Sequence, residues 1–459
     1  MLATLGLGSL TAAGGVVWSR QESRLPLDPI PPGGRIVVIG AGSASIAAVE
    51  KLTAAGYSID WIEARDRVGG RTHTEQLGKV PMDMGAAWLH DGAANYLRAR
   101  AEASPLEIFP TDFNNGVIQY QGELVPIDGA EVIRDFEASA VGPFVRHGLR
   151  SALTIPAAQP SIDSLLSTVA AKHGAQGAFG TSLVTANMGA PLTDVSMVVL
   201  MSSGGPGGDD GYDPFPTNDA MIEGGPCGLL TSFIGDLKPT LGETVESITR
   251  TASGIVVKSK RRSIEADAVI LTIPLALLKK NTIRIEPSLS TVQQAALGRM
   301  SSGREMKVFL EYPENAWDSS HHLVGQCDSP YFDFFINLRA VDGVPGIMAL
   351  SAGHKMEAAE AESDSMLAEA LHQDVRAVFG PSIPEPLAHG VSNFSQDPLS
   401  QCCWSNLGLN ALGNERFILQ QPIGGRILLA GEGLSDRSGT FDGAWNDGQR
   451  AAQAIIDAA

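Results

Sequence analysis

The stretch Arg35-Ile-Val-Val-Ile-Gly-Ala-Gly42 decides the fold of this 459-residue chain. Four consecutive β-branched residues predict a strand that is buried on both faces, as in a parallel sheet, and the glycines predict a tight turn. Residues 43–55 have the pattern of a helix, whose first N–H groups would receive a pyrophosphate. The positions expected to approach the phosphates, or to pack the helix on the strand, are Gly40, Gly42, Ser43 and Ser45.

A second predicted strand, residues 58–63, ends in an acidic residue, Glu63. An acid about twenty residues after the glycine turn accepts hydrogen bonds from both ribose hydroxyls of a dinucleotide. The same carboxylate would repel a 2′-phosphate, which argues against NADP. The pattern therefore predicts a Rossmann-like α/β domain that binds a dinucleotide.

A second glycine pair follows directly, in Glu63-Ala-Arg-Asp-Arg-Val-Gly-Gly-Arg-Thr72. Arg65, Gly70 and Arg71 would bring backbone and guanidinium groups to the far side of a diphosphate and offset its charge. NAD enzymes do not need this second clamp, so an NAD-binding Rossmann domain is the less favoured alternative.

The C-terminal region is expected to complete the dinucleotide-binding site formed by the N-terminal motifs. Arg426-Ile-Leu-Leu-Ala-Gly-Glu432 predicts another buried parallel strand, which delivers a carboxylate to the carboxyl edge of the sheet. Apolar residues at helical spacing then predict a helix that starts at Gly439 or Thr440. The free N–H groups of that helix would point at whatever lies beyond the strand.

Together these motifs resemble the flavin-dependent amine oxidase family, which includes monoamine oxidases, polyamine oxidases and histone-lysine demethylases. The shared features are the Gly-rich turn, the Glu-Ala-Arg-x-Arg-x-Gly-Gly-Arg run and a C-terminal Gly-Glu and Gly-Ala signature, spread over residues 35–457. The resemblance implies FAD as the cofactor and a bacterial member of the family. It places Val245, Gly431 and Glu432 among the FAD-binding residues, with Glu432 on a ribityl hydroxyl.

The resemblance also implies two domains. The expected fold is α/β, with a discontinuous Rossmann-like FAD-binding domain that carries the glycine doublet, and an α+β substrate-binding domain. The FAD-binding domain would comprise residues 34–95, 221–284 and 406–459. The substrate-binding domain would comprise residues 96–220, rich in helices, and 285–405, rich in strands.

Three residues are assigned to the reaction by position. Lys307, on an alternating strand, would hold a water near flavin N5 and assist proton handling and reoxidation. Trp404 matches an aromatic wall that aligns the amine. Thr440 stands where monoamine oxidases have a second aromatic wall, so the cage is incomplete and a substrate bulkier than a simple phenethylamine is expected. Its helix start would also stabilise negative charge near flavin N1.

The loop Met84-Gly-Ala-Ala-Trp-Leu-His-Asp91 matches the segment that covers the flavin in this family. Its expected cofactor contacts are Gly85, Ala86, Ala87 and Trp88. His90 is either a proton or hydrogen-bond acceptor in the substrate channel or a structurally satisfied histidine.

Cys403 falls where monoamine oxidases bond a cysteine to the flavin. Gln401-Cys402 replaces the glycine pair that usually precedes it. We therefore expect noncovalent FAD, with a bond to Cys403 as the alternative. The four cysteines are too few for a disulfide framework and have no zinc-like spacing, so no metal is expected.

The composition of the chain limits which molecules it is expected to bind. The formal charge of −18 disfavours nucleic acid and anionic membranes. It would either enrich cationic amines near the surface or only keep the protein soluble. The Gly-rich run at residues 204–214 predicts a surface connection or a lip over the substrate entrance.

Residues 1–33 are expected to form a signal-like segment and a linker. Residues 2–17 are apolar and uncharged, and resemble the apolar part of a twin-arginine export signal whose arginines lie upstream. Export to the bacterial periplasm is expected, with a disordered or weakly anchored N-terminus in a cytoplasmic protein as the alternative.

The expected function is hydride transfer from a neutral amine to FAD, giving an imine that water hydrolyses to a carbonyl. Oxygen or a redox protein would reoxidise the flavin, and a homodimer is left open. The alternatives are an L-amino-acid oxidase, a hydrocarbon desaturase on the same fold and a flavin-binding interaction protein without turnover. Trp88 stands where amino-acid oxidases commonly place Met-Arg, and the pair Lys307 and Trp404 weighs against a desaturase.

Overall fold

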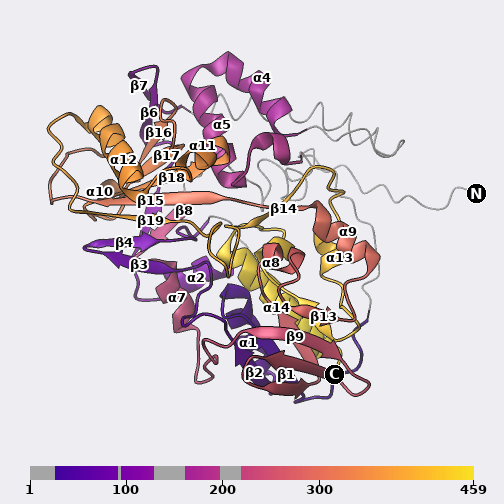
Figure 1. Cartoon of the computed structure of the whole chain (residues 1–459). Coiled ribbons are helices and arrows are strands. Elements are labelled where there is room, and N and C mark those ends of the chain that lie inside the picture. Colours follow the sequence, from indigo (N-terminus) through magenta and orange to yellow (C-terminus); the bar gives the residue numbers. More distant parts are fainter. Residues whose placement is uncertain (1–25, 91–94, 129–160, 197–218) are drawn as a thin grey trace, which may run out of the picture.

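The computed structural model describes residues 26–90, 95–128, 161–196 and 219–459 (Figure 1). The signal-like segment and the Gly-rich run at 204–214 lie outside these ranges. Within the described part of the chain, no helix is both long enough and apolar enough to cross a bilayer.

A four-stranded parallel sheet gathers strands from three distant parts of the sequence. Ile36, Val37 and Val38 are fully buried, as expected for a strand that is covered on both faces. The strand order is β2 (Ser58–Ile62), β1 (Arg35–Ile39), β12 (Ala268–Leu271) and β21 (Ile427–Leu429).

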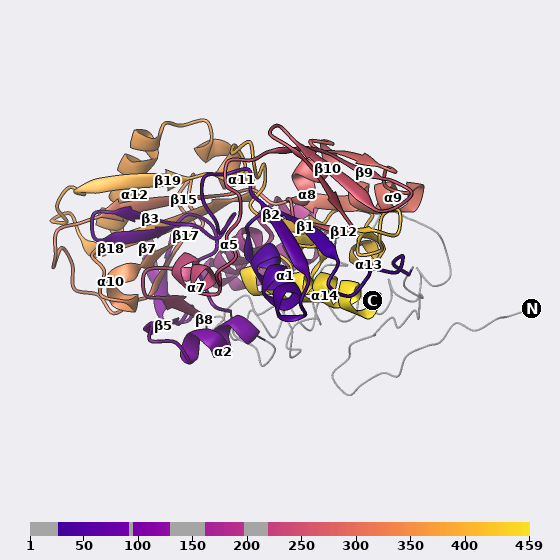
Figure 2. The same ribbon diagram turned by 90° about the horizontal axis from the view of Figure 1, so that it is seen from below.

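Two helices from opposite ends of the chain, α1 (Ser43–Ala54) and α14 (Phe441–Asp457), pack side by side against this sheet (Figure 2). A Cβ on Gly448 would lie 2.0 Å from the carbonyl oxygen of Ala44, so glycine is required for this close crossing. Ser43 Oγ donates to the carbonyl of Phe441 at 2.6 Å and joins the first turns of the two helices.

A second sheet packs on the other side of the parallel one, and a shared apolar core contains Val37, Val269, Ile248 and Val257. The order of this sheet is β11 (Ser263–Ala266), β10 (Ile255–Ser259), β9 (Val245–Arg250) and β13 (Arg284–Glu286). The helices that contribute to the same core are α8 (Leu275–Lys279), α9 (Thr291–Arg299) and α13 (Glu415–Leu419).

The remaining large sheet has seven strands and lies at the other end of the molecule (Figure 1). Its order is β19 (Ala388–Ser392), β15 (Glu305–Glu311), β18 (Gly346–Ala352), β17 (Phe334–Asn337), β16 (Leu323–Gln326), β6 (Gly116–Tyr120) and β7 (Glu123–Pro126).

Strand β15 is buried on both faces, and its side chains alternate between two apolar cores. Val308 and Leu310 share a core with α12 (Asp364–Phe379), whereas Phe309 shares a core with α5 (Ala175–Met188). Because alternate residues of a strand point the same way, Glu305 and Lys307 share the α5 face with Phe309.

Smaller elements connect the sheets. The two-stranded pairs are β3 (Thr74–Leu77) with β4 (Val80–Asp83), β5 (Ile108–Thr111) with β8 (Asp219–Ile222), and β14 (Met300–Ser302) with β20 (Ser405–Leu407). The other helices are α2 (Tyr96–Glu102), α4 (Asp163–His173), η1 (Leu192–Asp194), α7 (Pro226–Ser232), α10 (Leu338–Val341), α11 (Gly353–Ala359) and η2 (Glu432–Leu434).

The predicted fold class is confirmed. The described part of the stretch 96–220 differs from the expectation of mainly helices, because it contains the strands β5, β6 and β7 besides α2, α4 and α5. Two of these, β6 and β7, complete the seven-stranded sheet through parallel pairing of β6 with β16. The domain boundaries themselves stay predictions.

Candidate active site

The two glycine turns meet at the N-terminus of α1. Gly69 N donates to Ala41 O at 2.7 Å, and a Cβ on Gly70 would lie 3.3 Å from the Cα of Gly42. Gly42 is the N-cap of α1 and no side chain caps this helix. The turn therefore has the form of an anion site made of backbone N–H groups.

Glu63 lies directly after β2 and is held by backbone donors. Its carboxylate accepts from Ala41 N at 2.6 Å and from Arg65 N at 2.7 Å. Burial raises the pKa of Glu63, and these two hydrogen bonds oppose that shift. The predicted ribose-binding acid therefore lies in direct contact with the glycine turn.

Two other predicted positions lie in the body of the FAD-binding fold. Ser45 is fully buried and its hydroxyl donates to Gly42 O at 2.8 Å. Val245 is buried at the start of β9, two residues after Glu243, whose N–H donates to Glu63 O at 2.9 Å. The 243–245 segment therefore runs beside the predicted ribose site.

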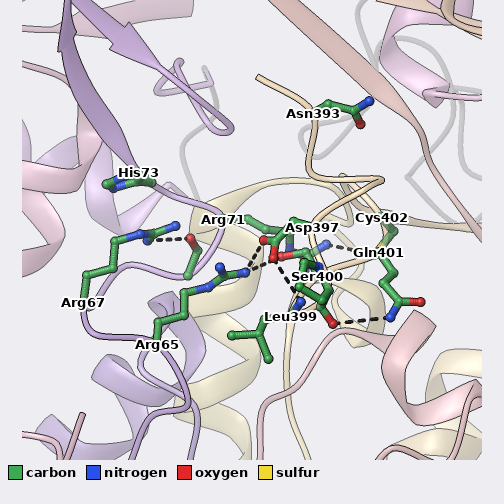
Figure 3. Close-up of polar contacts among 12 residues, drawn as sticks. Arg65, Arg67, Arg71, His73, Asn393, Asp397, Leu399, Ser400, Gln401 and Cys402 are labelled. Carbon is green, nitrogen blue, oxygen red and sulfur yellow. Dashed lines mark hydrogen bonds and ion pairs between the residues drawn. The ribbon is translucent and has the colours of Figure 1, made fainter. Parts of the chain in front are cut away.

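The predicted diphosphate arginines are already paired within the protein. Figure 3 shows Arg65 facing the loop of Asp397 and Ser400, where its guanidinium pairs with Asp397 and donates to Ser400 Oγ at 2.9 Å. Arg71 donates to Cys403 O at 2.7 Å and to Glu432 Oε1 at 3.1 Å. Burial acts to lower the pKa of Arg71, but Glu432 outweighs it, so this guanidinium stays charged.

Glu432 connects the C-terminal strand to its surroundings. Besides Arg71, its carboxylate accepts from Ser405 N at 3.2 Å, Ser405 Oγ at 3.1 Å and Gly439 N at 3.1 Å. Gly431, one residue earlier, donates its N–H to Asp447 at 3.0 Å. Glu432 therefore holds together the segments around Arg71 and Ser405 and the residues just before α14.

Thr440 is the N-cap of α14. Its hydroxyl accepts from Gly443 N at 2.9 Å and donates to Arg437 O at 2.9 Å. The helix therefore begins within one residue of the predicted start. Thr440 fixes the direction of the helix N-terminus, and its methyl group and hydroxyl do not form an aromatic wall.

Three glycines, Gly189, Gly303 and Gly439, lie close to Trp404. A Cβ on Gly189 would lie 2.7 Å from its ring and one on Gly439 would lie 3.3 Å from it, while Gly303 N donates to Trp404 O at 2.7 Å. The contact with Gly439 brings the predicted aromatic wall next to the start of α14.

Lys307 is buried and lies under the loop of residues 84–90. Its Nζ donates to Gly85 O and to Asp83 O, the latter at 3.2 Å, and lies 5.3 Å from the centre of the Trp88 ring. Burial lowers the pKa of Lys307, and Glu305 and Asp83 oppose that shift. A Cβ on Gly85 would lie 1.9 Å from Arg71 O, so the loop passes directly over the second glycine clamp.

The rest of this loop is buried or partly buried. Ala87 is 2% exposed, Ala86 N donates to Arg71 O at 3.3 Å, and the Trp88 ring nitrogen is buried without a protein partner within the described residues. That orphaned N–H is a donor available to a ligand.

His90 forms a pair that the sequence did not predict. Its Nδ1 lies 2.7 Å from Asp219 Oδ2, and Asn95 donates to its carbonyl. Burial acts to lower the pKa of His90, but Asp219, helped by Asp442 of α14, raises it above the ordinary value. The side chain of His90 remains 37% exposed although it is paired with Asp219.

Comparison with known proteins decides the family. Residues 46–456 match the family described as flavin containing amine oxidoreductase. The chain belongs to this family. Its curated relatives include a lysine-specific histone demethylase 1 homolog 2 from Arabidopsis thaliana, 26% identical over 93% of this chain. They also include polyamine oxidase 4 from Oryza sativa subsp. japonica, 28% identical over 91% of this chain and 87% of the rice protein.

The chain spans 59% of the Arabidopsis demethylase homolog and 54% of a rice demethylase homolog. Solved structures agree on the fold. Cyclohexylamine oxidase from Brevibacterium oxydans has a TM-score of 0.76 at 22% identity, over 93% of this chain and 99% of that one. Putrescine oxidase bound to putrescine also has a TM-score of 0.76, at 20% identity over 94% and 99% of the two chains.

FAD is the cofactor of this family, and the residues present fit it. Its dinucleotide half fits the uncapped first turn of α1, the close approach of Gly42 and Gly70, and the acid Glu63 beside the glycine turn. Lys307 and Trp88 suit the edge of a flavin. The sequence missed Asp219, Asp397 and Ser405 because nothing in their local pattern shows which distant groups they meet.

Proposed function

We propose that this chain oxidises an amine at its CH–N bond. The observation that carries the proposal is Lys307, a buried lysine whose ammonium is held by two backbone carbonyls below Trp88. Among the described residues, this ammonium forms no ion pair, and its hydrogen bonds go to Asp83 O and Gly85 O. Its lowered pKa suits a group that exchanges protons with a bound water.

The bound flavin supplies a two-electron acceptor for the hydride of the amine α-carbon. The chain's part is to hold a neutral amine against Trp404, exclude water with the loop of residues 84–90, and manage the released proton through Lys307. The imine product loses its nitrogen to water and leaves as a carbonyl compound. Either oxygen or a redox protein serves as the final acceptor.

We propose that FAD is bound without a covalent link. Cys403 Sγ donates to Glu305 O at 3.1 Å and accepts from Glu305 N at 3.1 Å, so the thiol is directed at the backbone of β15. Burial raises the pKa of Cys403 to about 12, which disfavours the thiolate that attachment would require.

Anaerobic stopped-flow bleaching of the flavin by an amine panel tests the proposal. Amines are expected to reduce the flavin, and Lys307→Met should slow reduction or reoxidation by about 10²-fold or more while FAD stays bound. Lys79→Met is the matched control, because Lys79 is exposed. A flavin that no amine bleaches, or equal rates in wild type and Lys307→Met, would overturn it.

A further inference from the structure

The segment of residues 397–403 leads directly to Trp404, and arginines of the second glycine clamp hold it in place. At its start, Arg65 pairs with Asp397 and donates to Ser400 Oγ at 2.9 Å. The side chains of this ion pair are only 15% and 19% exposed, so salt and water screen it less than a pair on the surface. Figure 3 shows Arg65 reaching towards the segment.

The other end of the segment is held by a second arginine. Arg71 donates to Cys403 O at 2.7 Å and to Cys402 Sγ at 3.5 Å. Between the two arginines, Lys280 donates to the side-chain oxygen of Gln401. Three cations from the predicted FAD-binding domain therefore bind one short segment of the predicted substrate-binding domain.

Asp397 also closes a turn within the segment. Its Oδ1 accepts from Leu399 N at 3.0 Å while its Oδ2 meets Arg65, and its carbonyl accepts from Ser400 N at 3.1 Å and Gln401 N at 2.9 Å. Burial acts to raise the pKa of Asp397, but the hydrogen bond from Arg65 outweighs it and lowers the pKa below the ordinary value. The ion pair therefore fixes a turn that is already ordered by its own backbone.

The position of this turn matters because Trp404 occupies a closely fitting place. Gly303 N donates to Trp404 O at 2.7 Å, and Cys403 N donates to Gly303 O at 2.8 Å. A Cβ on Gly189 would lie 2.7 Å from the Trp404 ring, and one on Gly439 would lie 3.3 Å from it. A shift of the preceding turn would therefore move the ring relative to the start of α14.

We propose that the ion pair of Arg65 and Asp397 sets the position of Trp404, which makes Asp397 a positioning residue. The inference rests on the proposed amine oxidation, in which Trp404 orients the substrate, and adds the contact that places this aromatic wall. Arg65 is also a predicted ligand of the FAD diphosphate. The pair therefore links the cofactor side of the site to its substrate side.

Hydrogen exchange of the full-length protein tests the pair without any turnover. Asp397→Asn keeps an oxygen that accepts from Leu399 N but removes the charge that Arg65 meets. Amide exchange in residues 395–404 should become about 10-fold faster in this variant, because the turn loses its attachment to the rest of the site.

Two further variants separate the pair from a general loss of stability. Asp28→Asn removes a carboxylate that pairs with Arg250 and Arg426, and it should leave exchange in the tested peptide unchanged. Adding Asp397→Asn to Arg65→Gln should cause no further exchange, because the two side chains act through one contact. Additive effects, or unchanged exchange in Asp397→Asn alone, would overturn the role of the pair.

Anaerobic flavin reduction measures the consequence for Trp404. In FAD-loaded Asp397→Asn, the limiting rate of flavin reduction by an amine should fall by about 10-fold, because a displaced wall no longer aligns the substrate. FAD affinity should stay within about 3-fold or become tighter, since Arg65 loses a carboxylate that competes with the diphosphate.

Equal losses of FAD affinity and reduction rate in Asp397→Asn would overturn the positioning role and leave amine oxidation intact. If no amine reduces the flavin of the wild type, amine oxidation and the role of Trp404 both fail. The hydrogen-exchange comparison would still decide whether Arg65 holds the turn.

Discussion

Gly448 offers a direct perturbation of the contact between the two ends of the chain. In Gly448→Ala, the new Cβ would lie 2.0 Å from Ala44 O and 2.9 Å from Ala44 Cα. An ordinary carbon–oxygen contact is about 3.3 Å, so α1 and α14 must separate by roughly 1 Å. Because Ala44 lies in the first turn of α1, the separation would move the N–H groups expected to hold the pyrophosphate.

Overpacking of this kind costs about 1–3 kcal/mol, partly offset by about 0.5–1 kcal/mol from replacing a helical glycine. A net loss of about 1–2 kcal/mol corresponds to a fall in Tm of several degrees, and we expect FAD affinity to weaken by about 10-fold. Differential scanning fluorimetry and fluorescence titration of the apoprotein with FAD measure the two effects.

Gly298→Ala in α9 is the control, since its Cβ would meet no atom within 4 Å. It should be neutral or slightly stabilising and should leave FAD affinity unchanged. If Gly448→Ala behaved like Gly298→Ala in both measurements, the close crossing of α1 and α14 would be wrong.

Three further outcomes are expected. Glu432→Gln leaves the buried guanidinium of Arg71 without its counter-charge and should lower the free energy of unfolding by about 3 kcal/mol, measured by urea denaturation; an unchanged midpoint would contradict the pairing. The pKa of His90 is raised by Asp219, so this pair stabilises the fold below about pH 6.5 and the contribution is lost as pH rises through the raised pKa. The Tm difference between wild type and His90→Gln should therefore shrink from acidic to alkaline pH. A difference that does not change with pH would show that His90 and Asp219 do not form a stabilising ion pair. Acid precipitation should leave the yellow colour in the supernatant, and colour in the pellet would show a bond to Cys403.

The dinucleotide half of the molecule was predictable because its signals are local. The β-branched run before Gly40, the acid at Glu63 and the helix start near Thr440 each depend on a few adjacent residues whose backbone requirements are strong. Their convergence followed from the rule that ligands bind at the carboxyl ends of parallel strands.

The substrate side was less accessible to sequence reasoning. Strands β6 and β7 escaped prediction because the hairpin that they form joins the sheet through β16, some two hundred positions later in the sequence, and pairing overrides weak local preference. Asp219 is a single acid whose partner, His90, lies 129 positions earlier in the sequence.

The measurement that tests the central claim most directly is reconstitution of apoprotein with FAD. Because the first turns of α1 and α14 meet at one site, the purified chain should take up one flavin per molecule, with a rise in Tm. Deletion of the segment from Gly439 onward should abolish uptake. A colourless protein that gains neither absorbance nor thermal stability from FAD would contradict the claim.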